Sequence, residues 1–265
     1  MDRPIGVIDS GVGGLTVAKE LMRQLPKEEL IYVGDTLRCP YGPRPKDEVM
    51  EYTWDMVNYL LKERIKMLVV ACNTATAYTL EHLREHLAIP VVGVIQPGAR
   101  AAIKTTKNSK IGVIGTEGTI KSKAYPNALH HINPDLVVHG LACPSFVPMV
   151  EQGLLYGPSA KKVVEQTLSP LKHNHQMDTL ILGCTHYPLL RETIQDVMGE
   201  DISVISSGDE TAREVSVLLE YYQTLYRGHR EPQHRFFATG DQHLFEQITN
   251  AWFGDPVATV DAVTL

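Results

Sequence analysis

Short apolar runs rich in valine and isoleucine alternate with longer segments of helical period along most of this chain. Such runs are typical of buried strands, and strands that alternate with helices are typical of parallel α/β sheets. One helical segment, for example, carries Leu80, Leu83 and Leu87 at helical spacing. The pattern predicts an α/β fold with mostly parallel sheets flanked by helices, and its strands are predicted at Ile5–Ile8, Leu30–Val33, Met67–Ala71, Val91–Ile95, Ile111–Ile114, Leu136–His139, Thr179–Leu182 and Ile202–Ile205.

The two halves of the chain repeat the same features in the same order. Three pairs of segments match at offsets of 104 to 112 residues: IGVIDSG with IGVIGTEG, VGDTLRCP with HGLACP, and VVACNT with ILGCTH. A single match of this kind is common in α/β proteins, but three in one order indicate an internal duplication. We therefore expect two similar lobes, related by a pseudo-two-fold axis, with an active site in the cleft between them.

The segment after Ser206 has no counterpart in this repeat, and it can complete the first lobe. The expected division is residues 1–96 plus about 208–265 for the first lobe, which is then discontinuous, and residues 97–207 for the second. Each lobe is long enough to bury a core of its own.

Composition narrows the class of protein. The formal net charge is −6 and no dense block of Lys and Arg occurs, so nucleic acid and anionic membranes are poor partners. The apolar runs are too short to span a bilayer, and Met1 to Pro4 lead directly into a predicted strand, which leaves no room for a signal peptide. Four cysteines in 265 residues do not indicate a disulfide scaffold. We expect a cytoplasmic protein whose cysteines act as thiols.

Polar residues cluster where the predicted strands end. They are Asp9-Ser10, Asp35, Cys72-Asn73-Thr74 and Cys184-Thr185-His186. Open α/β sheets bind ligands beyond the carboxyl ends of their strands. If the lobes face each other about a two-fold axis, Cys72 and Cys184 lie on opposite sides of one cleft.

Each of these two cysteines precedes an expected helix start. Asn73 or Thr74 can cap the first helix, and Pro188 suits the first turn of the second. The N-terminus of a helix favours negative charge, so it stabilises a thiolate over a thiol.

Four kinds of chemistry can use two such thiols. A redox pair is typically Cys-x-x-Cys, which is absent here. A zinc site from Cys184 and His186 needs further ligands from scattered residues such as Cys72 and Cys39. Covalent catalysis by one nucleophile leaves the second copy unexplained. Proton transfer at a stereocentre needs an acid on one face and a base on the other, so two-base racemisation is the reading that uses both.

Three nearby side chains can assist the thiols. Asp9 can orient or polarise the Cys72 side, while His186 and Glu151 can do the same for Cys184. On spacing alone, His186 can equally be a capping or core imidazole, and Glu151 a solvated helix residue.

The glycine-rich loop DSGVGGLT raises the alternative of dinucleotide binding, because it follows a strand and Asp35 ends the next one. Thr16, however, stands where the third glycine of that motif belongs, and Asp9 would place a carboxylate towards the pyrophosphate. Free backbone N–H groups in such a loop can equally hold a substrate carboxylate.

Taken together, four motifs resemble those of the glutamate racemases in the aspartate/glutamate racemase superfamily: DSGVGG from Asp9, Pro40-Tyr41-Gly42, ACNTAT from Ala71, and GCTHYP from Gly183. The resemblance extends from Ile5 to about Asp209. It implies two α/β lobes with the active site between them, and neither pyridoxal phosphate nor a metal.

The resemblance also implies roles for individual residues. Cys72 and Cys184 would be the two proton donors and acceptors, with Asp9 assisting the first and Glu151 and His186 the second. The substrate would be held by residues of all four motifs, namely Asp9, Ser10, Pro40, Tyr41, Gly42, Asn73, Thr74, Thr185 and His186. It gives no role to Cys39 or Cys143, which we expect to be structural.

Beyond the site, the resemblance implies glutamate as the small-molecule substrate, D-glutamate for peptidoglycan as the product, a bacterial cytoplasm and a homodimer. Some members are regulated through an N-terminal extension, which we do not expect here because the first strand begins so near Met1. The residues alone do not separate glutamate from aspartate, so an aspartate racemase stays open, as does a two-lobed amino-acid sensor without catalysis.

Overall fold

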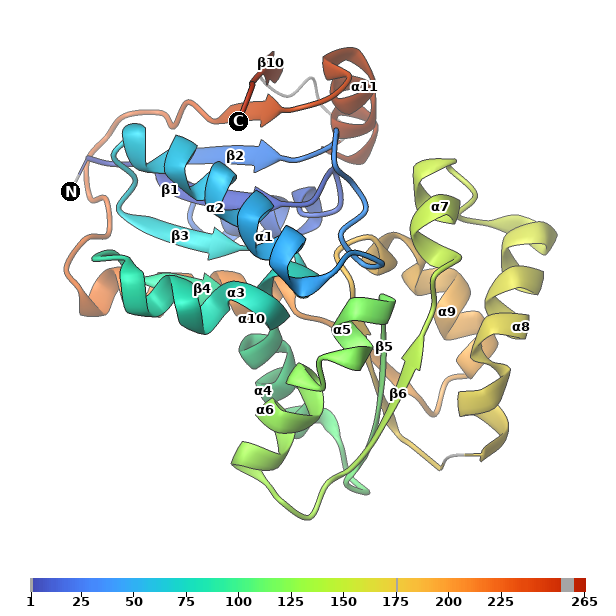
Figure 1. Cartoon of the computed structure of the whole chain (residues 1–265). Helices are drawn as coiled ribbons and strands as arrows, with labels where there is room; N and C mark the ends of the chain where they lie inside the picture. Colours follow the sequence, from blue (N-terminus) through green and yellow to red (C-terminus); the bar gives the residue numbers. More distant parts are fainter. Residues whose placement is uncertain (1, 175, 254–259) are drawn as a thin grey trace. The chain divides into compact units, whose positions relative to one another are not determined.

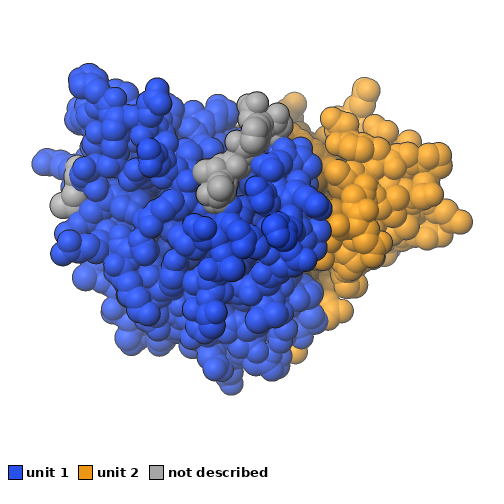
Figure 2. All heavy atoms as spheres, turned by 90° about the horizontal axis from the view of Figure 1, so that it is seen from above, with its two compact units in different colours: residues 1–94, 208–265 blue, residues 95–207 orange. Residues whose placement is uncertain are grey.

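A computed structural model describes residues 2–174, 176–253 and 260–265. The chain forms two compact units, one of residues 1–94 and 208–265 and the other of residues 95–207. Figure 2 shows them in two colours.

Unit 1 is built on a six-stranded sheet in the order β10-β9-β2-β1-β3-β4, in which every pair is parallel (Figure 1). Its strands are β1 (Ile5–Asp9), β2 (Leu30–Gly34), β3 (Met67–Val70), β4 (Val91–Gly93), β9 (Arg235–Ala238) and β10 (Val260–Ala262). Its helices are α1 (Leu15–Gln24), α2 (Lys46–Lys62), α3 (Asn73–His86), α10 (Gly208–Tyr221) and α11 (Gln242–Phe253).

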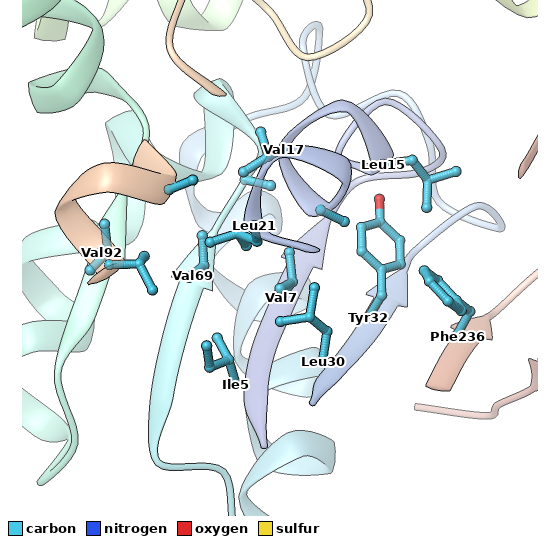
Figure 3. Packing of buried hydrophobic residues seen from close by; sticks show 14 of the residues in the cluster. Ile5, Val7, Leu15, Val17, Leu21, Leu30, Tyr32, Val69, Val92 and Phe236 are labelled. Atoms are coloured by element: carbon cyan, nitrogen blue, oxygen red, sulfur yellow. The ribbon is translucent and has the colours of Figure 1, made fainter. Parts of the chain in front are cut away.

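Alternate residues of these strands enter different cores. Leu30 and Tyr32 pack with residues of α1, α10 and α11, whereas Ile31 and Val33 pack with residues of α2 and α3. Figure 3 shows the first of these clusters, in which Val7 lies among neighbours from the sheet and α1. Since each fully buried aliphatic side chain contributes roughly 1.5–3 kcal/mol, burial on both faces explains why the strands are continuous apolar runs rather than alternating ones.

Unit 2 has a four-stranded parallel sheet in the order β6-β5-β7-β8. Its strands are β5 (Lys110–Gly115), β6 (Val137–Ala142), β7 (Thr179–Gly183) and β8 (Ser203–Ser206). Its helices are α4 (Ile95–Thr105), α5 (Glu117–Lys121), α6 (Ala124–Ile132), α7 (Phe146–Glu151), α8 (Gly157–Asn174), α9 (Arg191–Met198) and the 3₁₀ helix η1 (Tyr187–Leu190). Helix α4 packs on β7 and β8, and α8 packs on α9.

The two sheets share one strand order. In both, the first strand of the unit lies between the second and the third, and the fourth lies beyond the third: β2-β1-β3-β4 and β6-β5-β7-β8. In this order the chain leaves the first strand towards one edge of the sheet and the third strand towards the other edge. Open α/β sheets bind ligands at the carboxyl ends of two such neighbouring strands. The predicted class, parallel α/β with helices flanking the sheets, is confirmed.

Most predicted strands match the structure to within one residue at each end, but β6 continues to Ala142, three residues beyond the predicted end at His139. The predicted strand Val91–Ile95 ends at Gly93, because α4 already begins at Ile95. Strands β9 and β10 were not predicted, since they have only four and three residues and so provide too little apolar pattern to detect. Among the described residues, no helix is both long and apolar enough to cross a membrane.

Candidate active site

Cys72 lies between β3 and α3 and is itself the N-cap of that helix. Its Sγ accepts a hydrogen bond from the backbone N–H of Ala75 at 3.5 Å, and the thiol contacts Ser10 Oγ at 3.6 Å. The expected caps, Asn73 and Thr74, are instead the first two helical residues. The sulfur is therefore in contact with a backbone donor at the positive end of a helix, which favours negative charge on it.

Asp9 ends β1 and is fully buried beside the glycine-rich loop. Its Oδ1 accepts the N–H of Gly11 at 3.0 Å. At Gly14 a Cβ would lie 2.5 Å from Asp9 Cβ, so only glycine allows helix α1 to begin this close to the carboxylate. Burial raises the pKa of Tyr32, and Asp9 and Cys72 raise it further, so both groups lie within electrostatic reach of one phenol.

The loop after β2 carries the motif Pro40-Tyr41-Gly42. The peptide bond between Cys39 and Pro40 is cis, Pro40 is exposed, and Tyr41 and Gly42 are buried. Tyr41 Oη donates to Asp35 Oδ2 at 2.5 Å. Thus Asp9, Ser10, Cys72 and this loop all lie at the carboxyl ends of neighbouring strands β2, β1 and β3 of unit 1.

Cys184 follows β7 in unit 2 and is buried together with Thr185 and His186. Its Sγ lies 3.9 Å from His186 Nδ1, and His186 Nε2 lies 3.4 Å from Glu151 Oε1. Glu151 is the last residue of α7, with 39% of its side chain exposed. A thiol, an imidazole and a carboxylate therefore form a chain that runs from a buried strand end towards solvent.

The helix expected directly after Cys184 begins later and in another form. Its N-cap is His186, and the 3₁₀ helix η1 starts at Tyr187 with Pro188 in its first turn. The prediction for Pro188 is confirmed, but Cys184 is not a helix cap. Its Sγ instead contacts the imidazole of His186.

Sequence reasoning missed two side chains near Cys184. Thr116 follows β5, which pairs with β7, and its Oγ1 caps α5 by accepting from Thr119 N at 3.3 Å. Its alignment with Ser10 in the internal repeat could have identified it. Tyr125 is buried, and its pKa is raised by that burial and also by Cys184, although nothing in the sequence marks it.

The remaining cysteines differ in their surroundings. Cys143 is fully buried, and this burial, with a smaller effect of Cys184, raises its pKa to about 12. Cys39 is partly exposed and its Sγ would lie 3.0 Å from a Cβ at Gly11. Within the described ranges, no three side chains of His, Cys, Asp or Glu are grouped so that they could hold a metal ion.

Comparison with known proteins gives a consistent picture. The Asp/Glu/hydantoin racemase family model matches residues 5–215. The glutamate racemase of Oceanobacillus iheyensis is 65% identical over 96% of this chain and 92% of its own length. A crystal structure of a glutamate racemase isoform from Bacillus anthracis matches with a TM-score of 0.96 at 52% identity, covering 99% of this chain and 98% of that one. A glutamate racemase from Francisella tularensis, solved in complex with D-glutamate, matches with a TM-score of 0.92 at 33% identity, covering 99% of this chain and 98% of that one.

Proposed function

This chain belongs to the Asp/Glu/hydantoin racemase family, and on that premise we propose that it interconverts L- and D-glutamate by proton transfer between Cys72 and Cys184. The observation that carries the proposal is the repetition of a buried thiol after the third strand of each unit, in two sheets of the same strand order. Racemisation needs an acid and a base on opposite faces of the α-carbon. A duplicated thiol supplies both without a cofactor.

The reaction balances with these two groups. The thiolate of one cysteine removes the α-proton, so that a C–H bond breaks and an S–H bond forms. The thiol of the other cysteine then gives its proton to the opposite face of the carbanion. Each turnover exchanges the protonation states of the two sulfurs, and exchange with water carries solvent hydrogen into the α-position. By the family's pattern, Cys72 acts on D-glutamate and Cys184 on L-glutamate.

The partners of each sulfur support these roles. At Cys72, the N-terminus of α3 and the Ser10 hydroxyl contact the sulfur directly, and Asp9 is the nearby buried carboxylate. At Cys184, His186 contacts the sulfur and Glu151 orients the other side of the imidazole. We propose that Asp9 assists proton transfer at Cys72 and that His186 and Glu151 assist it at Cys184.

Substrate recognition is proposed for the polar strand ends around the thiols. Two carboxylates and an ammonium group need hydrogen-bond donors and at least one acidic acceptor. The residues proposed to hold them are Asp9, Ser10, Pro40, Tyr41, Gly42, Asn73, Thr74, Thr185 and His186. The complex of the Francisella relative with D-glutamate supports an amino acid of this kind as the substrate.

The biological setting is proposed from the relatives. They are bacterial glutamate racemases, which supports a bacterial cytoplasm as the location and D-glutamate for peptidoglycan as the product's use. We also propose a homodimer, which sedimentation at micromolar concentration would test.

The decisive experiment follows the circular dichroism of L-glutamate in D₂O with the pure protein. A racemase drives the signal to zero and places deuterium at the α-carbon. An unchanged signal, with measurable binding, would instead make the protein an amino-acid sensor. Repeating the assay with aspartate separates the two substrates, because an aspartate racemase would act faster on the shorter acid.

A second assay tests independence of cofactors. Dialysis against a chelator, and treatment with hydroxylamine to remove any aldehyde cofactor, should leave the rate unchanged. A loss restored only by a metal ion or by pyridoxal phosphate would contradict the two-thiol mechanism.

A further inference from the structure

The carboxylate of Asp35 is completely buried at the end of β2 and is held by three side chains. Tyr41 Oη and Arg38 Nε donate to its Oδ2 at 2.5 and 2.6 Å, and Thr239 Oγ1 donates to its Oδ1 at 2.8 Å. These bonds tie the Pro40–Gly42 loop to β2 and to the segment after β9. Three donors, one of them a guanidinium, therefore converge on one buried carboxylate.

Arg38 is the cationic partner of this carboxylate. Besides Asp35, it donates through Nη1 to Asp55 Oδ2 at 2.7 Å, and its guanidinium carbon lies 4.2 Å from the ring centroid of Tyr52. Its Nη2 is buried without a hydrogen-bond partner among the described residues. Packing against Tyr52 alone does not require that cost, because an apolar side chain of similar length would avoid it. The feature that an apolar residue could not supply is the charge.

The position of Asp35 makes its charge relevant to the proposed reaction. Burial raises the pKa of Tyr41 and Asp35 raises it further, while Arg38 opposes this and Cys72 adds to it. The Tyr41 hydroxyl is therefore within electrostatic reach of both Asp35 and the Cys72 sulfur. A substrate with two carboxylates at the Pro40–Gly42 loop would be repelled by an uncompensated Asp35, because like charges repel each other.

We propose that Arg38 is a positioning residue for substrate binding, which neutralises Asp35 so that the Pro40–Gly42 loop accepts a dicarboxylate. This rests on the function proposed above, in that glutamate is the ligand. Arg38 acts through Asp35 and the loop, and it does not itself touch the substrate.

Arg38→Met tests the proposal, because methionine keeps the packing on Tyr52 and removes the charge. Affinity is measured by calorimetry with racemic glutamate, in which no net reaction occurs, and kcat and KM by circular dichroism. We expect Kd and KM to rise about tenfold, equivalent to about 1.4 kcal/mol, with kcat changed less than about threefold. Arg38→Lys should recover part of the affinity, since it restores the charge without the planar fork.

The double variant Asp35→Asn/Arg38→Met separates charge from packing. Removing both charges should return the affinity to within about threefold of the wild type, because no unpaired carboxylate then remains to repel the substrate. The difference from the sum of the single effects measures the coupling between the two residues. Arg227→Met is the control for losing a paired arginine, because Arg227 pairs with Glu220 at the surface and does not belong to the Asp35 cluster. We expect it to change affinity less than about twofold.

The outcomes distinguish this proposal from the proposed function. Wild-type protein that binds glutamate without racemising it overturns the racemase, while the affinities of the variants still decide the role of Arg38. A double variant as weak as Arg38→Met overturns the role of charge. So does an Arg227→Met variant that is equally impaired.

Discussion

The two units place a thiol at the same point of one strand order, yet they surround it differently. In unit 1 the sulfur of Cys72 caps a 14-residue helix and accepts a backbone N–H. In unit 2 Cys184 is followed by a 3₁₀ turn, and its polar neighbour is the His186 side chain, backed by Glu151. The repeat also aligns Asp9 with Gly115, so unit 2 has no carboxylate at the end of its first strand.

This difference teaches that the two units share the position of the thiol but not the groups that surround it. Backbone dipoles at a helix N-terminus do not titrate and cannot be removed by one substitution. An imidazole and a carboxylate do titrate and can each be replaced. We expect the half-reaction at Cys184 to depend more on single side chains than the one at Cys72.

The largest expected effect comes from replacing either thiol. Cys72→Ser and Cys184→Ser should each lower racemisation by roughly 10²–10⁴-fold or more, because a hydroxyl is a far weaker acid and base in this role. With a substrate analogue that bears a leaving group on its β-carbon, proton removal alone leads to elimination. Each variant should then eliminate from one enantiomer only. Cys72→Ser should eliminate from the L form and Cys184→Ser from the D form. 

The assignment of enantiomers follows from the remaining thiol. If Cys184 removes the proton of the L-enantiomer, the variant that keeps it, Cys72→Ser, eliminates from that enantiomer. Elimination from the same enantiomer by both variants would place the two thiols on one face of the substrate and end the two-base interpretation.

The next largest effect comes from the assisting residues. Asp9→Asn and His186→Asn should slow proton abstraction by roughly 10–100-fold, each mainly in the direction that its neighbouring thiol serves. Single-turnover exchange of the α-deuterium measures the two directions separately, since at steady state the ratio of kcat/KM values is fixed by the overall equilibrium. Equal losses in both directions for both variants would assign these residues to structure alone.

Glu151→Gln should have a smaller effect in the same direction as His186→Asn. The carboxylate is 3.4 Å from His186 Nε2 but more than a third of it is exposed, so water screens the interaction. A loss of about two- to fivefold in abstraction from L-glutamate, which shrinks at high salt, is expected. A loss as large as that of His186→Asn would show that the carboxylate is as important as the imidazole.

The smallest effect on activity is expected for Cys143, which affects stability instead. Burial raises the pKa of the Cys143 thiol from an ordinary 9.0 to about 12 in the folded chain. Between these two pKa values the folded chain keeps a proton that the unfolded chain loses. The contribution of the Cys143 thiol to the free energy of unfolding is therefore complete below pH 9 and is lost as the pH rises from 9 to 12. In urea unfolding between pH 8 and 10.5, the free energy of unfolding should fall by at most about 1.4 kcal/mol per pH unit. Cys143→Ala should make this fall with pH less steep. Cys39→Ala is the matched loss of a thiol, and an unchanged slope in Cys143→Ala would contradict the assignment.

Much of the fold could be predicted from the sequence, because eight strands are apolar runs long enough to detect and the repeat fixes their pairing into units. Strands β9 and β10 could not be predicted, since three or four residues carry little periodicity. At the site, motifs identify Cys72 and Cys184, but they do not reveal that one sulfur caps a helix and the other contacts an imidazole. That depends on how the backbone turns after each strand. Tyr125 and Arg38 carry no motif of their own and became visible only through burial and contacts.

The pairing of β9 with β2 has a consequence for the order in which the chain is made. Strand β2 ends at Gly34 and its outer neighbour β9 begins at Arg235. At a synthesis rate of roughly 5–20 residues per second, the intervening chain takes roughly 10–40 s to emerge from the ribosome. Throughout that interval one edge of β2 has no strand to complete it, and an open apolar edge invites pairing with other chains. The nascent protein therefore has a period of exposure to aggregation that ends only after the segment from Arg235 onward has been translated.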